Sequence, residues 1–183
     1  KALSKVYFIG AGPGEPELIT VKGKRLLEEA DIVIYEGSLV NPEILKYAKK
    51  DAAIYDSASM NLDEIIKIMK DGAKNEKIIA RLHTGDTSLY SAIAEQMAES
   101  KREGIDFEII PGVTSASAAA ASLNIEFTMP EVTQTVIYTR IAGRTEVPEL
   151  ESLSSLAAHK ATMVIFLSVQ KIEEAVKGLL KSY

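Results

Sequence analysis

The sequence predicts an α/β fold, with a mostly parallel sheet and flanking helices, and three observations support this prediction. First, apolar, β-branched runs alternate along the chain with segments of helical periodicity. Second, these runs are nearly continuous in their apolarity, as expected for strands that helices cover on both faces. Third, glycine-marked loops follow three of the runs, where open α/β sheets bind ligands.

The expected strands in the first part of the chain are four short apolar runs, namely Val6–Ile9, Ile32–Tyr35, Lys77–Leu82 and Phe107–Ile110. Between the second and third runs, Asn61 is suited to cap a helix, and Glu64 completes a capping box. Apolar residues then recur at helical spacing. Two further helices are expected over Ser88–Glu103 and Thr114–Leu123.

The pattern restarts near residues 124–130, where we expect a domain boundary. An N-terminal α/β domain with the glycine-rich loops then covers residues 1–123, and a C-terminal α/β domain covers residues 124–183. The second domain is expected to contain strands in "TVIYTR" and "TMVIFL" and helices in "ELESLSSLAAH" and "KIEEAVKGLLKS". These elements are few for a closed sheet, so this domain is expected to be incomplete.

Composition excludes several classes of protein. The chain has 183 residues, of which 46% are hydrophobic, enough for a sizeable core. Its net charge of −5 argues against a nucleic-acid-binding protein held by a general basic field. The absence of cysteine excludes disulfides and thiolate metal sites and fits a reducing cytoplasm. No apolar run approaches the roughly 20 residues that span a bilayer, so we expect a soluble cytoplasmic protein.

The three loops that follow predicted strands are "GAGPGEP" (10–16), "HTGDTS" (83–88) and "PGVTSAS" (111–117). The first is not a dinucleotide fingerprint, because Glu15 stands where the third glycine belongs, and no lysine follows in P-loop spacing. The second and third loops, each taken alone, are more often a turn or a helix cap than a ligand site, and the first is as consistent with a bare turn as with a site. Three such loops at one end of a sheet predict a ligand site, at which Gly112 allows a ligand to approach the backbone.

The order and spacing of several stretches resemble the tetrapyrrole (corrin/porphyrin) methylase family. The stretches are "GAGPG", "ADIVIYEGSLV", "RLHTGDTSLYSA" and "PGVTSASAAAASL", and the later "TRIAGRTEVPELESLSSLAAHKATMVIFLS" extends the resemblance over essentially the whole chain. The resemblance implies an S-adenosylmethionine-dependent methyltransferase that is typically a homodimer. It also implies an active-site cleft between two α/β domains and relatives that run well beyond residue 183.

The resemblance implies a cofactor site built mainly from the glycine loops. The implied S-adenosylmethionine-binding residues are Gly12, Pro13, Gly14, Glu36, Thr84, Gly85, Asp86, Leu89, Thr114, Ser115 and Leu167. Glu36 stands where relatives often have aspartate, and Thr87 stands where the family usually has proline. Since S-adenosylmethionine has no phosphate, it suits a loop that does not complete a pyrophosphate cradle.

The implied substrate is a reduced tetrapyrrole, which carries several carboxylates. Its candidate binding residues are Arg81, His83, Arg140 and Arg144. No catalytic residue is assigned and no metal is expected, because a sulfonium methyl is already activated and its transfer needs mainly alignment and exclusion of water. Two alternatives stay open: another enzyme of the same family with a different substrate, and a non-catalytic cofactor-binding module. Nucleic acid and membrane are not expected as partners.

Overall fold

The computed structural model describes residues 5–183, which fall into two compact units. The first unit ends at Ala118 and the second runs from Ala119 to Tyr183. The division falls inside helix α4 (Ser115–Leu123), whereas the sequence pattern predicts a boundary after residue 123. Among the described residues, no helix combines the length and the apolar character needed to cross a bilayer.

The first unit contains a five-stranded sheet in the order β3-β2-β4-β1-β5, and every strand pair is parallel. The strands are β1 (Val6–Gly10), β2 (Ile32–Tyr35), β3 (Ala53–Asp56), β4 (Ile79–His83) and β5 (Phe107–Ile110). The prediction of a mostly parallel α/β sheet is therefore confirmed. The sequence pattern does not reveal β3, because it is an edge strand whose four residues are all exposed.

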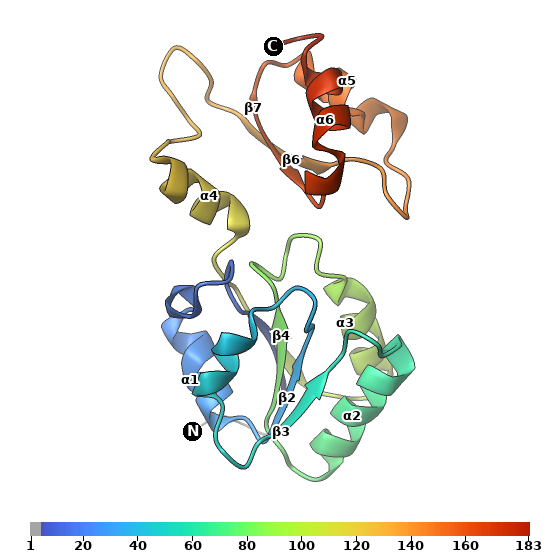
Figure 1. Ribbon diagram of the computed structural model, residues 1–183. Coiled ribbons are helices and arrows are strands. Elements are labelled where there is room, and N and C mark those ends of the chain that lie inside the picture. The colour runs from blue at the N-terminus through green and yellow to red at the C-terminus, as the bar shows by residue number, and fades with distance from the viewer. Residues whose placement is uncertain (1–4) are drawn as a thin grey trace. The chain divides into compact units, whose positions relative to one another are not determined.

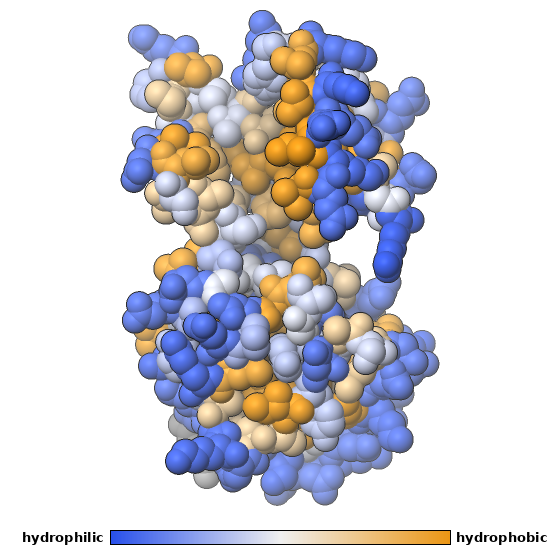
Figure 2. Space-filling model, in the orientation of Figure 1, coloured by the Kyte–Doolittle hydropathy of each residue, from blue (hydrophilic) through white to orange (hydrophobic). Residues whose placement is uncertain are grey.

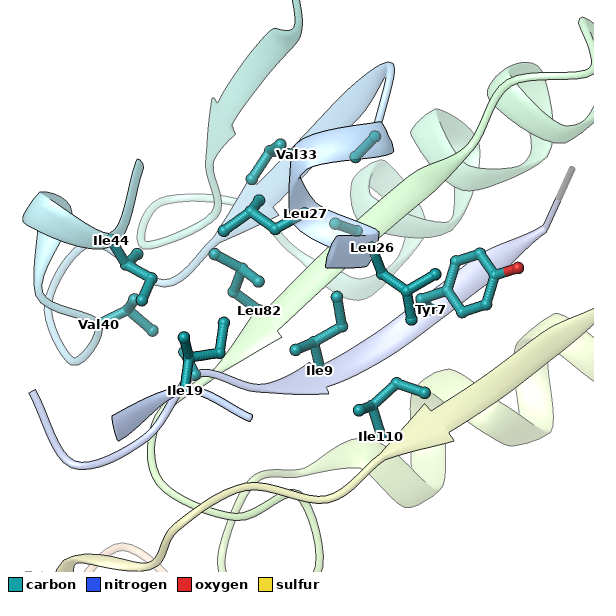
Figure 3. Close-up of a cluster of buried hydrophobic side chains, with 13 residues drawn as sticks. Tyr7, Ile9, Ile19, Leu26, Leu27, Val33, Val40, Ile44, Leu82 and Ile110 are labelled. Atoms are coloured by element: carbon teal, nitrogen blue, oxygen red, sulfur yellow. The ribbon is translucent and has the colours of Figure 1, made fainter. Parts of the chain in front are cut away.

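Helices cover both faces of this sheet (Figure 1). Helix α1 (Val21–Glu29) lies on one face, and α2 (Leu62–Lys74) and α3 (Ile93–Arg102) lie on the other. The cluster on the α1 face, drawn in Figure 3, includes Ile9, Leu26, Leu27, Val33 and Leu82; the cluster on the opposite face includes Phe8, Ile34, Ile66, Met69 and Ile79. Every residue of β1 and β4 is buried, which explains the continuous apolar run of β1, whereas β4 also buries the polar side chains of Arg81 and His83.

Helix α2 begins with the predicted capping box. The Asn61 side-chain oxygen accepts a hydrogen bond from the Glu64 backbone N–H at 3.0 Å, and the Glu64 carboxylate accepts one from the Asn61 backbone N–H at 2.8 Å. The two bonds satisfy backbone donors that have no partner within the helix. The prediction of this cap is confirmed.

Helix α3 begins later than predicted, at Ile93 rather than at Ser88. The Ser88 N–H instead donates to the Asp86 carboxylate at 3.0 Å, a local bond that competes with helix formation. Tyr90 and Ala92 then adopt left-handed backbone conformations, with φ of 53° and 50°, which a helix excludes. The segment between β4 and α3 is therefore an ordered loop.

The second unit contains a two-stranded parallel sheet of β6 (Val136–Arg140) and β7 (Thr162–Phe166), and both strands lie in stretches where a strand is predicted. Its helices are α5 (Leu153–Ala157) and α6 (Ile172–Leu179). The 3₁₀ helices of the chain are η1 (Pro16–Leu18), η2 (Pro42–Tyr47), η3 (Glu149–Glu151) and η4 (Val169–Lys171). Figure 2 shows hydrophobic side chains at the surface of this unit, and the exposed ones include Leu150, Val169, Ile172 and Leu180.

Replacing Asn61 by alanine tests the cap of α2. The Asn61→Ala variant loses the side-chain acceptor, and we expect the free energy of unfolding to fall by about 0.5–2 kcal/mol. Asn61→Asp keeps an acceptor at the same place and should stay close to the parent. Urea denaturation measures both variants, and equal losses in the two would contradict the capping role.

Candidate functional site

The carboxyl ends of β1 and β4 form the point of the sheet where a ligand site is expected. The two strands are neighbours, paired in register from Val6–Ile79 to Gly10–His83. The chain leaves β1 toward α1 on one face and leaves β4 toward α3 on the other. Open α/β sheets bind ligands where successive connections leave to opposite faces, because the loops there separate and leave a crevice.

The loops after β1 and β4 are joined by their backbones. The Gly12 N–H donates to the Gly85 carbonyl at 3.2 Å, and the Gly85 N–H donates to the Gly12 carbonyl at 2.7 Å. Both glycines have positive φ, 83° and 63°, a conformation in which a side chain is strained. The two predicted cofactor loops are thus one hydrogen-bonded assembly.

Asp86 joins the second loop to the third. One carboxylate oxygen accepts from the Gly112 N–H at 2.8 Å, and the other accepts from the N–H of Ser88. Burial acts to raise the pKa of Asp86, but the hydrogen bonds from Ser88 and Gly112 outweigh it and hold the pKa below its usual value. The carboxylate is therefore ionised at neutral pH and fixes the relative positions of the loops, while a contact between Asp86 and a cofactor stays a prediction.

Gly10 and Gly112 are explained by packing of one loop on another. A Cβ on Gly10 would lie 2.6 Å from the Gly112 nitrogen and 2.8 Å from the Gly85 carbonyl oxygen. A Cβ on Gly112 would overlap the Gly85 carbonyl oxygen as well. The sequence predicts that Gly112 allows a ligand to approach, whereas in the structure a side chain at this position is excluded by the contact between the loop backbones.

A pocket of about 290 Å³ lies in the first unit and brings together four of the predicted site residues. They are Glu36, which follows β2, Arg81 and His83 of β4, and Thr84, which follows β4. The remaining lining comes from residues to which the sequence pattern assigns no site role: Leu39, Ser57, Met60, Leu62, Ile65, Tyr90, Ser91, Ala92, Glu95 and Gln96. Of these, Ser57 and Gln96 are buried polar residues, and no sequence motif marks them.

Arg81 is a buried cation in the wall of this pocket, with 4% of its surface exposed. Its Nε donates to the side-chain oxygen of Gln96 at 3.0 Å, and one terminal nitrogen donates to the Ser57 hydroxyl at 2.9 Å. Burial lowers the pKa of Arg81 to about 10, while the negative charge of Glu36 acts in the opposite direction. Arg81 therefore keeps its charge at neutral pH.

His83 is a neutral imidazole next to that cation. Burial and, to a smaller extent, the charge of Arg81 lower the pKa of His83 to about 3, although a hydrogen bond with the Ser91 backbone acts against both. The ring lies 6.0 Å from the ring of Phe8, centroid to centroid, and its Nε2 has no hydrogen-bond partner within residues 5–183. A buried polar atom without a partner suggests a ligand or a water that completes it.

Other predicted residues of the first unit lie in the loops themselves. Pro13 and Gly14 are partly exposed, and the Gly14 carbonyl accepts from the Asn41 side chain at 2.7 Å. Leu89 is partly buried in the loop before α3. Thr114 and Ser115 lie at the start of α4, where the Thr114 hydroxyl accepts from the Ala116 N–H at 3.3 Å.

The predicted residues of the second unit have different surroundings. Arg140 donates to the carbonyls of Ile141, Thr145 and Glu146 and to the Thr145 hydroxyl, so it organises its own loop. Arg144 is exposed. Leu167 is 70% exposed and has a φ of 54°, an uncommon conformation for a residue with a side chain.

The charged and polar groups of the three loops are better suited to S-adenosylmethionine than to a nucleotide. Residues 10–16, 83–88 and 111–117 contain no lysine or arginine but include two acidic residues, Glu15 and Asp86. This charge disfavours a pyrophosphate and favours a sulfonium cation. The hydroxyls of Thr84, Thr114 and Ser115 and the glycine backbones are suited to hydrogen bonds with neutral polar groups.

The sequence matches the family model described as Tetrapyrrole (Corrin/Porphyrin) Methylases over residues 5–183. A protein of Methanocaldococcus jannaschii named cobalt-precorrin-4 C(11)-methyltransferase is 58% identical over 177 residues, which are 97% of this chain and 68% of that protein. The precorrin-4 C(11)-methyltransferase of Pseudomonas aeruginosa is 46% identical over 178 residues, 97% of this chain and 71% of that protein.

Solved structures show the same similarity. The X-ray structure of a cobalt precorrin-4 methyltransferase, described as a cobalamin biosynthetic enzyme, matches with a TM-score of 0.94 and 49% identity, over 98% of this chain and 75% of that one. The uroporphyrin-III C-methyltransferase of Thermus thermophilus, complexed with S-adenyl homocysteine, matches with a TM-score of 0.75 and 28% identity, over 97% of this chain and 72% of that one.

Substituting Gly112 tests the packing of the loops. A Cβ in Gly112→Ala would overlap backbone atoms of Gly10 and Gly85, so we expect a loss of about 1–3 kcal/mol in stability, as for an overpacked core. A Cβ on Gly143 meets nothing within 4 Å, and Gly143→Ala should change stability by less than about 0.5 kcal/mol. Thermal unfolding measures both, and an unchanged Gly112→Ala variant would refute the packing argument.

The burial of His83 predicts a pH dependence of stability. Below pH 6.5 the unfolded chain protonates this histidine, while the folded chain does not until about pH 3, so stability falls on acidification through this range. The contribution approaches about 1.4 kcal/mol per pH unit. His83→Gln removes it, and urea midpoints from pH 7.5 to pH 4.5 should decline less steeply in the variant. Equal slopes in the two proteins would contradict the assignment.

Proposed function

Because this chain belongs to the tetrapyrrole (corrin/porphyrin) methylases, we propose that it transfers a methyl group from S-adenosylmethionine to carbon-11 of precorrin-4 or cobalt-precorrin-4, in cobalamin biosynthesis. The observation that carries the proposal is the pocket in which Glu36, Arg81, His83 and Thr84 converge. It occurs in a chain 58% identical to a protein named cobalt-precorrin-4 C(11)-methyltransferase.

We assign the cofactor to the loops after β1, β4 and β5. S-adenosylmethionine supplies an activated methyl group on a sulfonium, which leaves the chain the tasks of binding, orienting and excluding water. The hydrogen bonds between Gly12 and Gly85 and from Gly112 to Asp86 hold the loops in one arrangement. Pre-formed loops lose little conformational freedom on binding, which favours a closely aligned transfer. The remaining cofactor residues of the proposal are Pro13, Gly14, Glu36, Thr84, Leu89, Thr114, Ser115 and Leu167.

We assign the substrate to Arg81 and His83 and to the second unit's Arg140 and Arg144. Arg81 is the strongest of these candidates, because it is buried beside a pocket and two neutral side chains fix its guanidinium. Arg140 already donates to several oxygen atoms of its own loop, so it would act mainly by shaping that loop. Arg144 is exposed, which leaves its guanidinium accessible to a carboxylate of the substrate.

Another enzyme of the same family, such as a precorrin-2 methylase or diphthine synthase, is the alternative. The "AGRTEVPE" stretch favours precorrin-4 over these relatives. The presence of cobalt in the substrate is left open, since relatives named for precorrin-4 and for cobalt-precorrin-4 are both similar to this chain.

The proposal extends to assembly, location and domain organisation. We propose a cytoplasmic homodimer whose interface covers apolar surface of the second unit, where Leu150, Val169, Ile172 and Leu180 are exposed. We also propose a domain over residues 1–123, which carries the glycine loops, and a second domain over residues 124–183.

Calorimetry and a methylation assay test the function. We expect S-adenosylhomocysteine to bind and NAD not to bind, because the loops contain acidic but no basic residues. With S-adenosylmethionine, the protein should methylate precorrin-4 or its cobalt form and leave precorrin-2 and the diphthine precursor unmodified. Binding of NAD in preference to S-adenosylhomocysteine would refute the methyltransferase assignment, and methylation of precorrin-2 alone would favour the alternative.

A further inference from the structure

We propose that the pocket lined by Arg81 is a subsite for a single carboxylate of the bound ligand, and that Gln96 and Ser57 are positioning residues that keep the Arg81 guanidinium free of an internal carboxylate partner. The identity of the ligand rests on the function proposed above, whereas the anion subsite rests on the geometry of the first unit alone.

Arg81 is buried without an ion pair. Only 4% of its surface is exposed, and none of the ion pairs found in residues 5–183 includes it. Burying a charge is costly unless it is paired, and buried charges in proteins are therefore usually paired or bound to a ligand. A bound carboxylate would supply the partner that the chain itself does not.

The partners that Arg81 does have are neutral and well placed. The side-chain oxygen of Gln96 accepts from Nε at 3.0 Å, and the Ser57 hydroxyl lies 2.9 Å from a terminal nitrogen. Gln96 and Ser57 are themselves buried, with 5% and 3% of their surfaces exposed. Both side chains fix the plane of the guanidinium without neutralising its charge, which is the arrangement expected of a prepared anion site.

The guanidinium retains donors for a ligand. It carries five N–H groups in a rigid fork, of which the bonds to Gln96 and Ser57 use two. The donors that are left match the two oxygens of a carboxylate. The pocket volume of about 290 Å³ lies at the lower end of the range for ligand sites, so it suits an acid side arm rather than a whole macrocycle.

Besides Arg81, the titratable residues that line the pocket supply no positive charge, so the pocket is suited to only one anionic group of a ligand. Glu36 stabilises the positive form of Arg81 from a distance, but its carboxylate accepts from the Ser38 hydroxyl at 2.8 Å and is not ion-paired with Arg81. Glu95, next to Gln96 on α3, also lines the pocket but is exposed. His83 is neutral and adds no positive charge. A second carboxylate would therefore meet repulsion without a second cation.

Two compounds in the proposed reaction carry a carboxylate that fits this subsite. One is an acid side arm of the tetrapyrrole, and the other is the carboxylate of the amino-acid part of S-adenosylmethionine. Arg81 of β4 lines a pocket whose wall also includes residues of α2 and α3 but none of residues 10–16 or 111–117, which favours the tetrapyrrole arm. Separate titrations with the two compounds distinguish the sources.

The variant Gln96→Glu tests the proposal, because it is nearly isosteric and gives Arg81 an internal carboxylate. We expect a higher melting temperature, since a buried cation gains a partner. We also expect affinity for uroporphyrin III, a tetrapyrrole octacarboxylic acid, to fall by about ten- to a hundredfold, with affinity for S-adenosylhomocysteine unchanged. Ala94→Glu adds the same charge to an exposed position of α3 and is the matched control, expected to change neither.

The results of these titrations test the carboxylate subsite and the proposed function separately. Unchanged affinity for both compounds in Gln96→Glu would overturn the subsite, and a loss confined to S-adenosylhomocysteine would support it with the cofactor as the source. Failure of the parent protein to bind S-adenosylhomocysteine would overturn the proposed function, while the uroporphyrin titration would still decide the subsite.

A measurement on the parent protein covers the case in which the variant does not fold. Sodium propionate should raise the melting temperature relative to sodium chloride at equal ionic strength, because a carboxylate that binds only the folded chain stabilises it. Equal melting temperatures in the two salts would overturn the subsite.

Discussion

The contact between the backbones of the loops after β1, β4 and β5 is the constraint on which the rest of the first unit depends. Gly12 and Gly85 exchange hydrogen bonds, and Gly10 and Gly112 approach so closely that neither has room for a Cβ. The distance between adjacent parallel strands sets the separation of the loops, so these contacts exist only where β4, β1 and β5 lie side by side. The glycines are required by this contact, which fixes the backbone positions of the three loops.

Burial, and not exposed ion pairs, sets the protonation states of the two titratable residues of β4 near this site. Arg81 and His83 lie two residues apart on the same side of β4, and both are removed from water. The histidine responds by remaining neutral, whereas the guanidinium remains charged because its pKa, although lowered, is still about 10. The pocket thus contains one fixed positive charge that is poorly solvated. A charge of this kind interacts more strongly with a ligand than the same charge in water would.

The two units differ in how completely they bury their apolar side chains. In the first, helices cover both faces of the five-stranded sheet, and large residues such as Phe8, Leu27 and Met69 have no exposed surface. In the second, a two-stranded sheet packs with short helices, and every residue of β7 keeps some exposure. A small sheet cannot bury both of its faces with so few elements, so apolar surface is left open. The structure therefore concentrates its rigid, pre-arranged groups in the first unit.

The sequence by itself determined the α/β class, most strands and the cap of α2, because apolar periodicity and capping residues act over a few neighbouring positions. Only the tertiary structure decided the pairing of Arg81 with Gln96 and Ser57, since these residues come from separate elements and no local pattern connects them. It also decided the packing role of Gly112, which depends on contacts with the backbones of Gly10 and Gly85. Local interactions specify which elements form, but a site is made by side chains distant in sequence, and their contacts exist only once the sheet has brought the strand ends together.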